Sequence, residues 1–373
     1  MDQEHSVKVA ATRRLRLTLD AWRRLVGQID PARARFHWRT RVSYQLGGAF
    51  HSLLLQIQEH SHADALKAVN PQPPIFLLGF WRSGTTFLHE LFCCDPTFGF
   101  PSTHACLNPS HFLLSERWIS ERVAQEKSQR PMDNMRYSWT SPQEDEFALL
   151  ALGAPSVYEA LIVPSLMRQP GRLLDLRQRT QEEQDRWRAT FCYFVRLLTV
   201  QQGKPMVLKS PPHGFKLPFL TSLFPDARYV IIERNPYEVF ASNLKLWRTL
   251  IDMYSLEVTS PEEIETFVLS AYVMHEEALA EGDQKVDPRS ITRVRYEDLV
   301  ADPVGQMARI YDELQLGSFA TVQPRLEKYT ADASHHTRNR FQLPRTQKNR
   351  IDGAWGQVIE RKGYDWSNYI SLC

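Results

Sequence analysis

The sequence has few cysteines, little net charge and no long apolar run, and each shortage argues against a class of protein. Five cysteines among 373 residues, two of them adjacent, lack the spacing of a disulfide framework or a zinc site. We therefore expect reduced thiols and a cytoplasmic location. The net charge of +2, with bases and acids interleaved, gives no reason to expect a nucleic-acid partner.

Long hydrophobic stretches are also missing. No window approaches the roughly 18 apolar residues of a membrane-spanning helix, and segment 1–22 lacks the apolar core of a secretory signal. The overall composition, 43% hydrophobic and 24% charged, is that of a globular protein with a sizeable core. We expect a soluble protein that is not secreted.

Two regions differ in pattern along the chain. Residues 1–70 are charged and helical in pattern, and prolines at positions 71, 73 and 74 separate them from the rest of the chain. We expect residues 1–70 to form a helical N-terminal extension packed on a main domain of residues 71–373. From residue 74 onward strand-like and helix-like segments alternate, which predicts an α/β fold with a central parallel sheet flanked by helices. The expected strands are Ile75–Phe80, Pro205–Lys209, Arg228–Arg234 and Ile291–Arg295.

The first expected strand leads into a compact turn and then an amphipathic helix. The turn is bounded by Gly79 and Gly84, and Phe87 opens the apolar face of the helix. A helix that starts after such a loop presents free N–H groups and a positive dipole, so it binds phosphate. The glycine spacing is that of a nucleoside-triphosphate P-loop, but Thr85 stands where the lysine should follow, and the loop's cation is Arg82.

Two further strand ends carry chemistry, and ligands bind at such ends in open α/β sheets. Lys209 ends one strand and His213 follows four residues later, so a cation lies near a group that titrates close to neutral pH. Arg234 ends another strand, and Ser242 lies eight residues further, about two turns into the next helix. An arginine and a hydroxyl so placed can hold one phosphate between them.

Together these three segments resemble the sulfotransferases that use 3′-phosphoadenylyl sulfate (PAPS), in the bacterial and tyrosylprotein-type branch. The sequence RSGTT resembles that family's 5′-phosphosulfate loop, LKSPPH its lysine-bearing strand end, and VRYEDLVADP a later segment of the family. The resemblance covers roughly residues 74–300 and implies the P-loop-like sulfotransferase fold. It departs from cytosolic small-molecule members at Arg82, where those have lysine, and after Lys209, where those have Lys-x-His.

The resemblance implies a set of donor-binding residues. They are Arg82, Ser83, Gly84, Thr85, Thr86 and Phe87 for the 5′-phosphosulfate and Arg234 with Ser242 for the 3′-phosphate. The RKG sequence at Arg361–Gly363 is similar to a phosphate loop of other members, but its context resembles a closing helix. Arg338 is then the better candidate for a late phosphate contact.

The implied reaction is an in-line transfer of the sulfuryl group to a hydroxyl, without a metal. Lys209, with Arg82, would stabilise the leaving phosphate. His213 is the first candidate for the general base, and Glu146, His104 and His111 are alternatives. Ser141 with Glu144 fits a capping box, which gives Glu144 a structural role.

Other functions and the acceptor stay open at this point. An ATP-dependent kinase or NTPase is disfavoured by Thr85 and by the lack of an evident Mg²⁺ carboxylate. A non-catalytic nucleotide-binding protein is a second alternative. The acceptor is expected to be an alcohol or phenol on a small molecule, a lipid or a glycan. The aromatic region 101–165 is either its pocket or core, and the sequence does not predict the oligomeric state.

Overall fold

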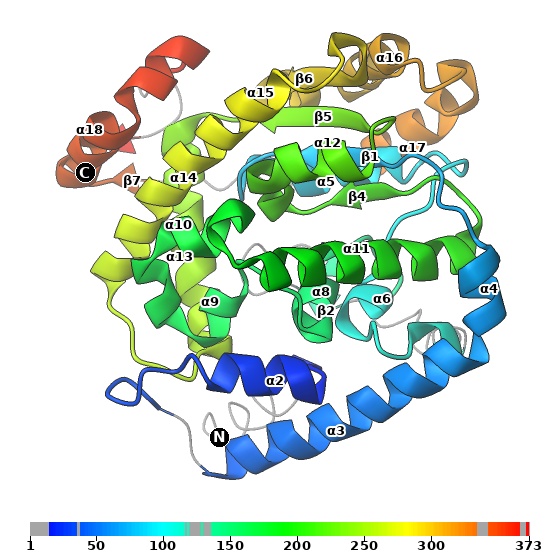
Figure 1. Cartoon of the computed structure of the whole chain (residues 1–373). Helices are drawn as coiled ribbons and strands as arrows, with labels where there is room; N and C mark the ends of the chain where they lie inside the picture. The colour runs from blue at the N-terminus through cyan, green and yellow to red at the C-terminus, as the bar shows by residue number, and fades with distance from the viewer. Residues whose placement is uncertain are drawn as a thin grey trace. The chain divides into compact units, whose positions relative to one another are not determined.

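The computed structural model describes residues 15–35, 38–115, 118, 128–129, 136–333, 342–365 and 371–372. The chain, whose helices and strands are labelled in Figure 1, falls into two compact units. The first comprises segments 1–70, 102–201 and 245–267, and the second comprises 71–101, 202–244 and 268–373. Residues 1–70 thus cluster with two later segments, and their definition as a separate extension stays a prediction.

The second unit is built on a four-stranded parallel sheet in the order β4-β1-β5-β6. The strands are β1 (Ile75–Leu78), β4 (Val207–Lys209), β5 (Arg228–Glu233) and β6 (Ile291–Arg295). The predicted α/β class with a central parallel sheet is confirmed. Strand β1 ends two residues earlier than expected because the turn to the next helix begins at Gly79.

One face of this sheet is covered by aliphatic packing. Helix α5 (Thr85–Phe92) packs on β1 and β4, and α16 (Pro303–Leu314) packs on β6. The buried side chains are Ile75, Leu77, Val207, Val230, Ile232 and Val294 from the sheet and Leu88, Leu91, Phe92, Met307 and Ile310 from the helices. Alternation along β1 turns Phe76 to the other face, where it stacks on Tyr229 at a centroid distance of 5.6 Å.

The rest of the second unit is largely helical. Its elements are α12 (Leu217–Leu223), α15 (Tyr296–Ala301), α17 (Gln323–Ala333), α18 (Arg345–Lys362), and the short strands β7 (Gln342–Leu343) and β8 (Ser371–Leu372). Helices α13 (Pro236–Tyr254) and α14 (Pro261–Asp283) begin or end in it. Trp355 anchors α18, since its indole N–H donates to Leu269 O at 2.9 Å and its ring lies 4.1 Å from that of Tyr272.

The first unit is also helical. Its elements are α2 (Leu19–Val26), α3 (Trp38–Ser61), α4 (Ala63–Ala68), α6 (Thr103–Leu107), α8 (Glu146–Leu152), α9 (Glu159–Ile162), α10 (Pro170–Leu174) and α11 (Gln181–Gln202), with strands β2 (Ser128–Gln129) and β3 (Arg136–Tyr137). Trp22 of α2 stacks on Tyr44 of α3 with centroids 4.6 Å apart. No helix in the described part of the chain is long and apolar enough to cross a membrane.

Candidate active site

The turn between β1 and α5 is held by its own backbone and by one hydroxyl. The Ser83 backbone N–H and side-chain hydroxyl both donate to Phe80 O, at 3.2 and 2.7 Å. Arg82 and Gly84 have φ angles of 71° and 101°, in the left-handed region. These two left-handed residues let the chain reverse and enter α5 at Thr85.

Gly84 is required for a second reason, which is the close approach of Tyr296 from α15. A Cβ at this position would lie 2.3 Å from Tyr296 Cδ2, well inside van der Waals contact. Any side chain here would displace either the ring or the loop. The glycine therefore fixes the distance between the turn and the segment after β6.

The predicted anion cradle lies at the start of α5. Gly84 caps the helix without a side-chain bond, and the first turn comprises Thr85, Thr86 and Phe87. The N–H groups of a first helical turn have no carbonyl one turn earlier to bond, and they carry the positive end of the dipole. The structure thus places the predicted loop residues around one set of backbone donors.

Three predicted residues from separate segments converge beside this turn. Arg82 Nε donates to Ser242 Oγ at 2.8 Å, and Arg234 Nη1 donates to Arg82 O at 3.2 Å. Arg82 and Ser242 are 160 positions apart in sequence. The loop arginine and the Arg234–Ser242 pair, which the sequence assigned to opposite ends of the donor, are therefore in direct contact.

The Arg234 guanidinium is also fixed by the first turn of the helix that follows it and by an aromatic ring. It forms an ion pair with Glu238 one turn along α13, with N–O distances of 2.8 and 2.9 Å, and lies 4.3 Å from the centroid of the Tyr296 ring. Asn243, next to Ser242, donates to Trp81 O at 2.8 Å. Helix α13 thus holds both the loop backbone and the loop arginine.

Lys209 ends β4 opposite Leu77 of β1. Its side chain is buried, and by alternation it projects to the same face as Val207, which is the face covered by α5. Burial raises the pKa of the Cys93 thiol at the end of α5, and the charge of Lys209 opposes that effect. The lysine therefore faces the helix that starts at the anion cradle.

His213 does not lie on the same face of the sheet as Lys209. It is fully buried, its backbone N–H donates to Ser210 O at 2.9 Å, and its ring meets the Phe76 ring edge-on at 5.5 Å. Phe76 projects from the opposite face of β1 to Leu77, so the His213 ring packs on the other side of the sheet from the Lys209 side chain. The structure does not bring this pair together on one face.

The alternative bases belong to the first unit. Glu146 is fully buried at the first position of α8. The ring of His104 lies between Asn108 Nδ2, at 2.8 Å from Nδ1, and Ser115 Oγ, at 3.0 Å from Nε2. Burial, followed by the charges of His111 and Arg16, lowers the pKa of His104 to about 4. His111 Nδ1 lies 2.9 Å from the same Ser115 hydroxyl, and burial lowers its pKa as well.

The predicted capping box is wrong. Helix α8 begins at Glu146 with Asp145 as its N-cap, so neither Ser141 nor Glu144 occupies the required position. Ser141 Oγ instead accepts from Ser138 N at 2.9 Å, and Glu144 accepts a hydrogen bond from the Tyr158 hydroxyl. Glu144 therefore makes a structural contact with the Tyr158 side chain and not with the backbone at the start of the helix.

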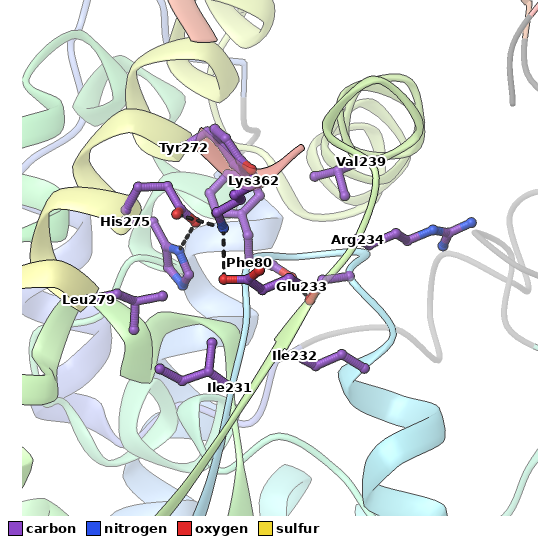
Figure 2. Close-up of a pocket in the computed structure, with 12 residues that line it drawn as sticks. Phe80, Ile231, Ile232, Glu233, Arg234, Val239, Tyr272, His275, Leu279 and Lys362 are labelled. Carbon is purple, nitrogen blue, oxygen red and sulfur yellow. Dashed lines mark hydrogen bonds and ion pairs between the residues drawn. The ribbon is translucent and has the colours of Figure 1, made fainter. Parts of the chain in front are cut away.

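The basic residues near the C-terminal end of the chain differ in their surroundings. Arg338 lies outside the described residues. Arg361 is exposed, while the Lys362 side chain is only 9% exposed and its ammonium lies 2.7 Å from Glu276 Oε2 and 3.2 Å from Glu233 Oε1 (Figure 2). The RKG sequence therefore ends α18 in an ion cluster, as expected for a closing helix.

This cluster of Glu233, Glu276, His275 and Lys362 was not predicted. It borders a cavity of about 10 Å³, room for about one water, which Phe80 and Ser83 of the loop also line. Burial alone would raise the pKa of Glu276, but its contacts with His275 and Lys362 outweigh this and lower it to about 2. Burial lowers the pKa of His275, so the imidazole is neutral at neutral pH. Among the described residues no group of three or more His, Cys, Asp or Glu is arranged to hold a metal ion.

Known proteins resemble this chain in sequence and fold. A family model described as the Sulfotransferase family matches residues 73–320. The chain is 37% identical over 347 residues to omega-hydroxy-beta-dihydromenaquinone-9 sulfotransferase Stf3 of Mycobacterium bovis, which covers 92% of this chain and 89% of that protein. The protein of the same name from Mycobacterium tuberculosis matches equally well.

Solved structures share the fold at low sequence identity. The crystal structure of sulfotransferase STF9 from Mycobacterium avium superposes with a TM-score of 0.62 at 20% identity, covering 86% of this chain and 82% of that one. Sulfotransferase STF1 from Mycobacterium tuberculosis gives 0.61 at 21% identity, covering 83% and 87%. The P-loop-like sulfotransferase fold predicted from the turn and strand ends is confirmed, and the chain belongs to the sulfotransferase family.

Proposed function

We propose that this sulfotransferase takes the sulfuryl group from PAPS and transfers it to the hydroxyl of a lipid, by in-line displacement without a metal. The observation that carries the donor assignment is the contact of Arg82 with both Ser242 and Arg234, directly beside the start of α5. It supports two adjacent anion sites, one of helix amides and one of arginine and hydroxyl donors. A donor with phosphate groups on both the 5′ and 3′ positions needs two such sites.

Each of the two sites would bind a different group of the donor. The amides of Ser83–Phe87 would hold the 5′-phosphosulfate. Arg234 and Ser242 would hold the 3′-phosphate, with Arg82 contributing from the loop because it already bonds Ser242. A phosphosulfate carries less charge than a triphosphate, so these donors suffice without the P-loop lysine that Thr85 replaces. An ATP-dependent kinase is not favoured for the same reason.

The chemical step needs a cation for the leaving oxygen and a base for the acceptor. The acceptor oxygen attacks sulfur as the bond from sulfur to the bridging oxygen breaks, and adenosine 3′,5′-bisphosphate leaves with that oxygen. Lys209 would hydrogen-bond the bridging oxygen and stabilise its negative charge, as burial strengthens such an interaction. The base would take the proton of the acceptor hydroxyl.

The base can be assigned by comparing variants. His213 stays the first candidate from sequence, with Glu146, His104 and His111 as alternatives. His213→Gln, Glu146→Gln, His104→Gln and His111→Gln should each be measured, and the base is the residue whose loss lowers kcat by roughly two to four orders of magnitude while donor affinity stays unchanged. A His213→Gln variant with normal kcat would give His213 the packing role that its contact with Phe76 supports.

The acceptor proposal rests on the sequence relatives. Stf3 is named for a menaquinone that carries an omega-hydroxyl, and it is 37% identical across 92% of this chain. Among the small-molecule, lipid and glycan acceptors that the sequence left open, this supports a lipid with a terminal hydroxyl on an apolar chain. A screen of alcohols of rising chain length with labelled donor tests this: kcat/KM should rise with apolar length.

We propose the cytoplasm as the compartment. No disulfide joins the four described cysteines, Cys93, Cys94, Cys106 and Cys192, which fits a reducing environment. Fractionation of cells expressing the protein, with detection in the soluble and membrane-associated fractions, tests this location.

Calorimetry tests the donor proposal. Adenosine 3′,5′-bisphosphate should bind much more tightly than Mg·ATP or 5′-AMP, because only the bisphosphate fills both anion sites. Tighter binding of Mg·ATP would contradict the proposal. Binding of the bisphosphate without transfer of labelled sulfate to any acceptor would identify a non-catalytic nucleotide-binding protein instead.

A further inference from the structure

Helix α3 carries a continuous apolar stripe that is exposed to solvent. Six large hydrophobic side chains recur along it every three or four residues, so they share one helical face. They are Trp38, Val42, Leu46, Phe50, Leu53 and Ile57, with exposed fractions of 71, 41, 69, 57, 55 and 43%. At 1.5 Å per residue the stripe is roughly 28 Å long. An exposed apolar patch of this extent marks an interaction site.

The opposite face of α3 is fixed, so the stripe cannot turn inward. Tyr44 stacks on Trp22 of α2, and Gly48 allows such a close approach that a Cβ there would lie 3.0 Å from Leu19 Cα. Gln58 Nε2 donates to Pro109 O at 2.9 Å, and its Oε1 accepts from Leu113 N at 3.0 Å. Helix α3 therefore presents the stripe in one defined orientation within the first unit.

The charge of α3 indicates what the stripe contacts. Residues 38–58 contain no aspartate or glutamate, although the chain has 43 acidic residues. Arg39 and Arg41 are exposed at the start of the helix, and the Arg39 guanidinium lies 5.6 Å from the centroid of the Trp38 ring. Apolar side chains on one face, a terminal tryptophan and arginines without acidic neighbours in sequence are the features of a helix that lies in the interface of an anionic membrane.

The apolar exposure continues next to the helix. The segment that Gln58 binds through Leu113 carries Leu114 and Trp118, with exposed fractions of 37% and 73%. An exposed tryptophan suits the boundary between headgroups and acyl chains. The first acidic residue of α3 is Glu59, beyond the end of the stripe, so a soluble protein partner would find few charges along the stripe to fix its register.

We propose that α3 docks this protein on the surface of an anionic phospholipid bilayer through the Trp38–Ile57 stripe. The inference rests on the proposed function, because a lipid acceptor resides in such a bilayer and a docked enzyme meets it there. Docking concentrates the enzyme where the acceptor is and leaves the chemical step unchanged.

Vesicle binding by the full chain tests the docking. Wild-type protein should sediment with vesicles of equal parts phosphatidylglycerol and phosphatidylcholine. The variant Leu46→Ser/Phe50→Ser/Leu53→Ser should bind about a hundredfold more weakly, from the apolar surface it loses. Arg39→Gln/Arg41→Gln should bind about thirtyfold more weakly to these vesicles and be unchanged on pure phosphatidylcholine. Gln45→Ser/Gln56→Ser, on the same helix, is the matched control and should bind like wild type.

An activity comparison separates this inference from the acceptor proposal. The stripe variant should transfer sulfate to a soluble short-chain alcohol at the wild-type rate and lose transfer only to a long-chain alcohol embedded in vesicles. Equal vesicle binding by wild type and the stripe variant would overturn the docking, whatever the acceptor proves to be. A dimer in sedimentation that the stripe variant converts to a monomer, with no vesicle binding by wild type, would also overturn it and assign the stripe to a second copy of the chain.

Discussion

Replacing Lys362 by methionine should destabilise the second unit strongly, because it removes a cation that contacts both Glu233 and Glu276 in the cluster. The two N–O distances are 3.2 and 2.7 Å, and the side chains of Lys362 and Glu276 are each less than a tenth exposed. Methionine keeps most of the apolar stem. Removing one member of a buried ion pair costs about 3–5 kcal/mol, since the remaining charge stays buried without its partner.

The pKa of Glu276 is consistent with a contribution of this order. The hydrogen bond from His275 and the contacts with Lys362 together lower it from the ordinary value of 4.5 to about 2, which corresponds to about 3 kcal/mol of stabilisation of the ionised carboxylate, and Lys362 supplies part of that. Because the folded-state pKa is depressed, this stabilisation is present above about pH 4.5 and is lost as the pH falls toward 2. The difference in unfolding free energy between wild type and Lys362→Met should therefore be full at pH 7 and shrink below pH 4.5.

Urea unfolding followed by tryptophan fluorescence at pH 7 and pH 4 measures this difference. Arg361→Met is the matched control, because Arg361 is its neighbour in the RKG sequence but is 62% exposed and 3.8 Å from Glu276. We expect it to cost less than about 0.5 kcal/mol. A Lys362→Met variant of wild-type stability that instead loses affinity for adenosine 3′,5′-bisphosphate would refute the cluster and make RKG a phosphate loop.

Two further predictions concern the donor site. Gly84→Ala should lower affinity for adenosine 3′,5′-bisphosphate at least about tenfold, because its Cβ would lie 2.3 Å from Tyr296 and would strain a left-handed residue. Gly203→Ala is the control, since Gly203 also has a positive φ but a Cβ there would meet nothing within 4 Å. Its affinity measured by calorimetry should be unchanged. Arg234→Ala should weaken bisphosphate binding by about ten- to a hundredfold and hardly affect 5′-AMP; equal losses for both ligands would remove Arg234 from the 3′-phosphate site.

Local sequence patterns were enough to predict the strands of the sheet and the loop between β1 and α5. Strands β1, β4 and β5 contain short apolar runs that lead directly into a glycine or a charged residue, so the chemistry at their carboxyl ends could be read directly from sequence. The contact of Arg82 with Ser242 could not, because it depends on how α13 folds back over the turn. The sequence predicted these residues as donor contacts, but it did not predict that Arg82, assigned to the 5′-phosphosulfate, would contact Ser242, assigned to the 3′-phosphate.

Other features depend on contacts between distant segments. Lys362 meets Glu233 and Glu276 only because α18, β5 and α14 pack together, and no spacing in the sequence indicates this. The capping-box prediction is wrong because Ser141 belongs to a loop and not to the start of α8. Its carbonyl accepts a hydrogen bond from Thr103 N at 2.8 Å. Helical periodicity predicted α3, but it does not tell which apolar face stays exposed.

Turnover by Lys209→Ala tests the central claim most directly. With PAPS carrying labelled sulfate and a long-chain alcohol as acceptor, wild type should form a labelled sulfate ester. The variant should lose roughly two to four orders of magnitude in kcat and keep most of its affinity for adenosine 3′,5′-bisphosphate. Turnover near the wild-type value would contradict the assignment of Lys209 to the leaving oxygen, and with it the proposed mechanism of sulfuryl transfer.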